Sequence, residues 1–104
     1  MTTVIHQRRR YSYPANQIVW IDRMSKWGNP YSHLARARAP HHVKTRAEAI
    51  ERFTEWWFAP EQAELRVQAL IELKDKVLVC WCKPELCHGD VIARFVNDAY
   101  GMVA

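Results

Sequence analysis

The apolar positions of this chain form runs of strand length and runs with helical spacing. Residues 77–82 are almost continuously apolar, which is typical of a strand covered on both faces. Residues 2–7 and 18–21 are shorter stretches that are rich in β-branched side chains and bounded by polar residues. The pattern therefore predicts about three strands, with residues 77–82 in the centre of the sheet.

Three other segments repeat apolar residues at the spacing of a helix. The first starts at the capping box Thr45-Arg46-Ala47-Glu48 and ends at Pro60. The second covers residues 61–73, and the third begins after residues 87–90 and ends before Gly101. This order predicts a small α/β sandwich in which helices cover the sheet, with a Rossmann-like strand-to-helix corner after the central strand.

The first predicted helix contains two adjacent tryptophans. Trp56 continues the apolar stripe, so we expect it in the core. We expect Trp57 at the margin of the stripe, where an exposed aromatic side chain offers a surface to a partner protein.

A long irregular segment separates the second strand from the first helix. Residues 22–44 include Gly28, Pro30 and Pro40, and predict a loop with one helical turn near residues 33–38. A loop of this length in a small domain is usually functional or mobile, and we expect a functional one here. With 104 residues the chain is expected to be one domain, in which residues 1–13 form a short strand and a basic arm.

Composition narrows the setting of the protein. No apolar run reaches the ~20 residues that cross a bilayer, and no apolar segment follows Arg8–Arg10 as in a secretory signal. We therefore expect a cytoplasmic protein with reduced thiols and no membrane partner. The formal net charge of +4 makes nucleic acid one candidate partner, although no recognition-helix, zinc-finger or RNP pattern supports it.

All three cysteines lie in the segment CWCKPELCHGD, residues 80–90. Thiolates and imidazole are zinc ligands, so Cys80, Cys82, Cys87 and His88 form a candidate Cys3His zinc site. Zinc ligands usually come in pairs that are two to four residues apart, and this spacing differs. A structural zinc module therefore stays one alternative.

A second interpretation of the segment is a catalytic thiol. Cys87 is next to His88 and near Asp90 at the start of a helix, where the helix dipole lowers the pKa of a thiol. A third interpretation is structural: Cys80 and Cys82 pack as small apolar residues, and Asp90 caps the helix.

Two motifs together resemble a known family. They are Trp27-Gly28-Asn29-Pro30, preceded by Ile21-Asp22-Arg23, and Cys80-Trp81-Cys82 with Cys87-His88-Gly89-Asp90. In this order they are similar to the family called domain of unknown function 4326, found in short proteins of bacteria and their phages. The resemblance implies a protein of a bacterial cytoplasm, or of the host cytoplasm if it is phage-encoded. It supplies no mechanism, and this chain has Asp22 where the family often has glycine.

The resemblance pairs the two motifs, and the leading hypothesis places them in one pocket that binds a nucleotide or a related phosphorylated small molecule. A cation, an amide and an aromatic ring are suited to a phosphate, a base edge and a base plane. The alternative for this motif is a structural loop, with Trp27 in the core and a turn at Gly28-Asn29-Pro30. If the domain is an enzyme, we expect group transfer or hydrolysis, with Cys87 or Asp90 as nucleophile or base and His88 as proton carrier. The main alternative is a phage protein that binds a host protein through a basic and aromatic surface. The predicted ligand-binding residues are Arg23, Trp27, Gly28, Asn29, Pro30 and Cys82.

Overall fold

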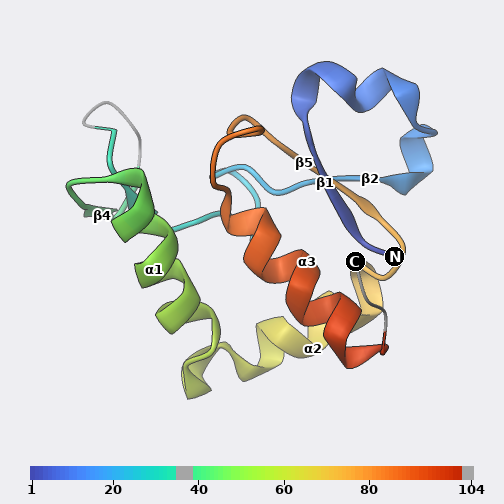
Figure 1. Ribbon diagram of the computed structural model, residues 1–104. Helices are drawn as coiled ribbons and strands as arrows, with labels where there is room; N and C mark the ends of the chain where they lie inside the picture. The colour runs from blue at the N-terminus through green and yellow to red at the C-terminus, as the bar shows by residue number, and fades with distance from the viewer. Residues whose placement is uncertain (35–38, 102–104) are drawn as a thin grey trace.

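The computed structural model describes residues 1–34 and 39–101 (Figure 1). Its centre is a parallel sheet of three strands in the order β1 (Thr3–His6), β5 (Val77–Cys80) and β2 (Ile18–Trp20). All four residues of β5 are buried, as expected for a strand covered on both faces. The α/β class and the central position of this strand are confirmed, although the strand ends at Cys80 rather than at Cys82.

The register of the sheet brings the carboxyl ends of the three strands together. His6 pairs with Cys80, and Trp20 pairs with Val79. The segments that follow β2 and β5 therefore leave the sheet at the same edge, which is where open parallel sheets bind ligands.

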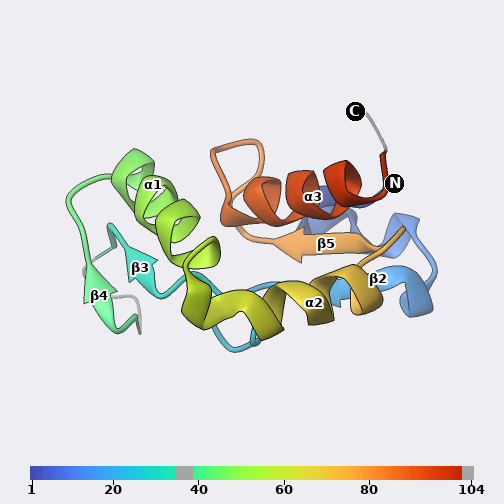
Figure 2. The same cartoon turned by 90° about the horizontal axis from the view of Figure 1, so that it is seen from below.

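Helix α3 (His88–Ala99) covers one face of the sheet, and Figure 2 shows it running along β5. Ile92 and Val96 of α3 are buried in one cluster with Leu78. A reciprocal pair of hydrogen bonds ties this helix to the start of β1. The amide of Thr2 donates to Oδ1 of Asn97 at 2.8 Å, and Nδ2 of Asn97 donates to the carbonyl oxygen of Thr2 at 2.9 Å.

Two short 3-10 helices, η1 (Gln7–Ser12) and η2 (Ala15–Gln17), connect β1 to β2 (Figure 1). Next to them, Tyr13 and Ile18 pack on Ile5, Val77 and Val79 in a second, smaller cluster. Because side chains alternate along a strand, Val77 and Val79 face away from Leu78. The N-terminal segment therefore covers the face of β5 that α3 leaves open.

Helix α1 (Arg46–Trp57) begins at the predicted cap. Thr45 Oγ1 accepts a hydrogen bond from the amide of Glu48 at 3.0 Å, and the Glu48 carboxylate accepts one from the amide of Lys44 at 3.3 Å. The expectation for the two tryptophans was wrong. Trp57 is fully buried and Trp56 only partly, because Phe53, four residues before Trp57, extends the buried stripe to it and Phe95 of α3 packs on its ring.

The second predicted helical segment consists of η3 (Pro60–Gln62) and α2 (Ala63–Glu72). Ala69 and Leu73 enter the main core cluster, with Leu65 packed against it. Ile71 is exposed on the other side of the helix. In the part of the chain that is described, no helix is long and apolar enough to span a membrane.

The segment predicted as a loop contains a second, two-stranded parallel sheet of β3 (Tyr31–Ser32) and β4 (His41–His42). The sequence analysis missed it because two-residue strands are too short to show periodicity. The predicted helical turn near residues 33–38 falls mostly on residues 35–38, outside the described residues.

Candidate functional site

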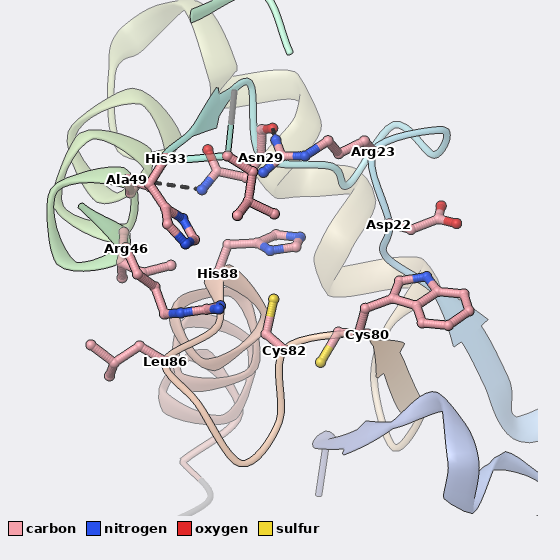
Figure 3. Close-up of a pocket in the computed structure, with 13 residues that line it drawn as sticks. Asp22, Arg23, Asn29, His33, Arg46, Ala49, Cys80, Cys82, Leu86 and His88 are labelled. Carbon is pink, nitrogen blue, oxygen red and sulfur yellow. Dashed lines mark hydrogen bonds between the residues drawn. The ribbon is translucent and has the colours of Figure 1, made fainter. Parts of the chain in front are cut away.

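A cavity of about 150 Å³ lies at the carboxyl ends of β2 and β5, between the first turns of α1 and α3 (Figure 3). We call it the corner cavity. Its lining combines polar side chains with an apolar wall, and comes from both predicted motifs and from α1. The lining residues are Asp22, Arg23, Asn29, His33, Leu34, Arg46, Ala49, Ile50, Cys80, Trp81, Cys82, Leu86 and His88.

His88 joins the two motifs. Its Nε2–H donates to the carbonyl oxygen of Ile21 at 2.7 Å, and its ring packs edge-on against Phe53. Only 7% of the residue is exposed, and this burial lowers the pKa of His88. The imidazole is therefore neutral at physiological pH, with its proton on Nε2.

Arg23 and Asn29 hold the loop that follows β2. Arg23 Nη1 donates to the carbonyl oxygens of Asn29 and Tyr31, the latter at 3.1 Å. Asn29 accepts the amide of Tyr31 on Oδ1 at 2.9 Å and donates from Nδ2 to the carbonyl oxygen of Ala49 at 3.2 Å. Both side chains line the cavity, but these bonds also fasten the loop to itself and to α1.

The other residues of the WGNP motif do not line the corner cavity. Trp27 is buried in the core, with its ring centroid 6.4 Å from that of Trp57. A Cβ atom on Gly28 would lie 2.7 Å from the carbonyl oxygen of Asp22, so the chain passes itself too closely there for a side chain. The Pro30 carbonyl accepts the amide of His41 at 3.1 Å, which joins β3 to β4. These three residues shape the loop.

The three cysteines occupy different environments. Cys80 is buried, and its thiol donates to the carbonyl oxygen of Ile5 at 3.5 Å. Cys87 is also buried and caps α3, where its sulfur accepts the amide of Gly89 at 3.3 Å. Cys82 is half-buried and lines the corner cavity. Cys80 also lines the cavity but is only 1% exposed, so Cys82 is the most accessible of the three thiols.

The contacts of Cys82 lower the pKa of its thiol. Hydrogen bonding to the sulfur atoms of Cys80 and Cys87 lowers the pKa of Cys82, and the positive charge of Arg46 lowers it further. The same contacts, together with burial, raise the pKa of Cys87. Figure 3 shows the Arg46 side chain reaching toward Cys82. The arrangement thus places a thiol of lowered pKa and a guanidinium together in the cavity.

Asp90 lies outside the lining of the corner cavity. Asp90 lies in the first turn of α3, and its carboxylate forms an ion pair with Lys83 Nζ at 2.6 Å. The predicted capping role of Asp90 was wrong, because the sulfur of Cys87 makes the cap.

Three of the four predicted zinc ligands make bonds with the backbone. Cys87 accepts a backbone amide, while Cys80 and His88 donate to backbone carbonyl oxygens. Within residues 1–34 and 39–101, no group of three or more His, Cys, Asp or Glu side chains is arranged to hold a metal ion. Zinc binding stays a prediction.

Sequence reasoning missed several lining residues, above all Arg46 and His33. Arg46 directly follows the Thr45 cap, so the sequence located it at a helix start but did not indicate that this end of α1 faces the cysteines. His33 belongs to the irregular segment, where no pattern predicts the direction of a side chain.

The fold and the corner cavity define a class: a small parallel α/β domain whose cavity lies where a strand-to-helix corner meets the loop after the neighbouring strand. The family model described as "Domain of unknown function (DUF4326)" matches residues 4–98. The chain belongs to this family, and the resemblance based on the two motifs is confirmed.

The chain is also similar to a protein of Enterobacteria phage T4 described as "Uncharacterized 12.4 kDa protein in nrdA-td intergenic region". The two are 31% identical over 88 residues, which are 85% of this chain and 75% of the phage protein. No solved structure matches the chain.

Proposed function

We propose that the corner cavity binds a nucleotide or a related phosphorylated small molecule in the cytoplasm of a bacterial cell. The observation that carries the proposal is the meeting of both motifs in one cavity, with Arg23 and Asn29 from one and Cys82 and His88 from the other. Arg46 adds a cation at the first residue of α1, where the helix dipole also favours an anion.

The size of the cavity limits what it can enclose. A cavity near 150 Å³ holds a single six-membered ring, whereas sites for whole ligands usually exceed about 300 Å³. Only one part of a nucleotide therefore fits inside, and the rest would lie over the mouth. The apolar wall of Leu34, Ile50 and Leu86 suits a ring, and Arg46 suits a phosphate at its edge.

The observations support binding better than they support a particular reaction. Cys87 is buried and Asp90 is paired with Lys83, and neither of these predicted nucleophiles or bases lines the cavity, whereas His88, the predicted proton carrier, does. The Nε2–H of His88 is engaged by Ile21. If the domain performs group transfer or hydrolysis on a nucleotide, Cys82 is the better-placed nucleophile.

Isothermal titration calorimetry with nucleoside monophosphates, the matching nucleosides, ribose 5-phosphate and inorganic phosphate tests the proposal. We expect at least one phosphorylated compound to bind, and its phosphate-free counterpart to bind about tenfold more weakly or worse. Arg46→Ala should reduce the affinity by about 10- to 100-fold. Arg52→Ala is the matched control, since Arg52 lies on the same helix, exposed and outside the cavity.

Two results would overturn the proposal. One is the absence of heat from every compound at about millimolar concentration. The other is equal binding by the unchanged protein and by a folded Arg46→Ala variant. Among the described residues, Arg46 is the cation of α1 that lines the cavity, so equal binding would mean that the phosphate does not contact it.

A further inference from the structure

A second cluster of side chains lies at the carboxyl ends of the strands, outside the corner cavity except for Trp81. We call it the aromatic-basic surface and define it as His6, Arg10, Tyr11, Trp20 and Trp81. The rings of Trp20 and Trp81 have centroids 6.3 Å apart and are tilted by 36°, and His6 meets Trp81 edge-on at 6.5 Å. The strands β1, β2 and β5 are parallel, so their carboxyl ends lie side by side. His6 ends β1, Trp20 ends β2 and Trp81 directly follows β5, which brings the three rings to the same edge of the sheet.

These rings are exposed. The exposed fraction is 61% for Trp81, 37% for Trp20 and 83% for Tyr11, whereas Trp27 and Trp57 are buried in the core. Neither Trp20 nor Trp81 belongs to the two buried clusters of the described residues. The exposed parts of these rings are therefore available to a ligand.

Positive charge accompanies the rings. The guanidinium of Arg10 lies 4.3 Å from the ring centroid of Tyr11 and 5.7 Å from that of Trp20. Arg8 and Arg9 are exposed in the same short helix, η1. The first 21 residues contain these three arginines and no Asp or Glu, and Asp22 is the first acidic residue. The surface thus attracts a polyanion.

We propose that the aromatic-basic surface binds single-stranded nucleic acid, with bases stacked on Trp20 and Trp81 and backbone phosphates held by Arg8, Arg9 and Arg10. Exposed rings beside a cationic segment are the two elements that such sites combine. Base planes are accessible in a single strand but are stacked on one another inside a duplex. The surface offers flat rings rather than a groove-reading helix, so binding should depend little on sequence.

This inference and the proposed small-molecule site share Trp81, which lines the corner cavity, but each also depends on residues of its own. Trp20 does not line the corner cavity, and Arg46 is not part of the surface. Failure of one proposal therefore leaves the other standing.

Fluorescence anisotropy with labelled dT and rU oligonucleotides of about ten nucleotides tests the inference. Both should bind, since each offers the same planes and phosphates, and a DNA duplex of equal length should bind at least about tenfold more weakly. If three phosphates are contacted, raising the salt from about 50 mM to about 200 mM should weaken binding by about 20-fold.

Variants separate stacking from charge. Trp81→Ala and Trp20→Ala should each weaken binding by about tenfold, while Trp81→Phe, which keeps a ring, should retain most of it. Phe58→Ala is the matched aromatic control, because Phe58 is exposed at the end of α1 beside Phe95. The pair Arg8→Ala with Arg9→Ala should flatten the salt dependence, and Arg52→Ala with Arg94→Ala, which removes the same charge elsewhere, should not.

A measurement on the unchanged protein tests the inference even if a variant fails to fold. Bases that stack on Trp20 and Trp81 should quench tryptophan fluorescence when an oligonucleotide binds. The inference is overturned if neither oligonucleotide binds at about 50 mM salt, which is also the outcome expected if the surface serves only a protein partner. It is equally overturned if folded Trp20→Ala and Trp81→Ala variants bind like the unchanged protein, or if the duplex binds as tightly as the single strand.

Discussion

His88 and Ile21 are 67 residues apart in the chain, yet the Nε2–H of His88 donates to the Ile21 carbonyl oxygen at 2.7 Å. This bond joins the amino end of α3 to the carboxyl end of β2. Because Asp22 and Arg23 directly follow Ile21, and His88 directly follows Cys87, this bond holds together the two motifs that contribute residues to the corner cavity.

The buried imidazole makes stability depend on pH. Burial lowers the pKa of His88 below its ordinary value of 6.5, so below that pH the unfolded chain takes up a proton that the folded protein does not. Stability should therefore fall as the pH decreases from about 6.5, by at most about 1.4 kcal/mol per pH unit, until the folded pKa is reached. Urea unfolding of the protein and of His88→Gln, which keeps an N–H donor but does not titrate, measures the difference. Identical pH profiles for the two would contradict the assignment.

The bonds between Thr2 and Asn97 should be necessary for stability. Asn97→Ala leaves the buried amide and carbonyl groups of Thr2 without partners, which should cost about 2–4 kcal/mol. Asp98→Ala is the matched control on the same helix. The Asp98 side chain is exposed and forms a surface ion pair with Arg94, in which the Nε and Oδ2 atoms are 3.6 Å apart. The control substitution should change the free energy of unfolding by no more than about 0.5 kcal/mol. Equal effects of the two substitutions in urea titrations would refute this prediction.

Gly89 should be coupled energetically to Ile21. A Cβ atom on Gly89 would lie 2.5 Å from Cδ1 of Ile21, so Gly89→Ala should destabilise the fold by about 1–3 kcal/mol. Ile21→Val removes that methyl group and alone should cost about 0.5–1.5 kcal/mol. The double variant should be more stable than the sum of the two losses predicts, as measured by a double-mutant cycle in urea. Simple additivity would mean that the helix shifts instead.

Cys82 should be the most readily alkylated of the three thiols. Its neighbours lower its pKa, so it should react with iodoacetamide at about pH 6, where an ordinary cysteine, with a pKa near 8.5, is almost entirely protonated. Buried Cys80 and Cys87 should be protected in the folded protein. Mass spectrometry of peptides labelled across a pH series measures this, and Arg46→Ala should move the Cys82 profile to higher pH. Uniform labelling of all three residues, or a Cys82 profile like that of free cysteine, would disprove it.

Local sequence patterns predicted much of the fold. The apolar run at residues 77–82 predicted a central strand because a strand buried on both faces has no polar side to show. The capping box predicted the start of α1 because the Thr45 hydroxyl is close in sequence to the amide that it satisfies. The two-residue strands β3 and β4 have no comparable local pattern, since each exists only through its partner.

The residues of the candidate site divide in the same way. The motifs identified Arg23, Asn29, Cys80, Cys82 and His88, all of which line the cavity, together with Trp27, Gly28, Pro30, Cys87 and Asp90, which do not. Residue type and spacing do not show which way a side chain points. The choice of Cys82 over Cys87 depends on one thiol turning to the cavity and the other capping a helix.

By itself, the sequence determined the α/β class, the central strand and the main helices, because periodicity and caps act between residues that are near neighbours in the chain. Only the tertiary structure decided that Arg46 faces Cys82 and that Trp20 lies beside Trp81. Those contacts join segments far apart in sequence, and they arise from the parallel register of β2 and β5 and from the packing of α1 against α3.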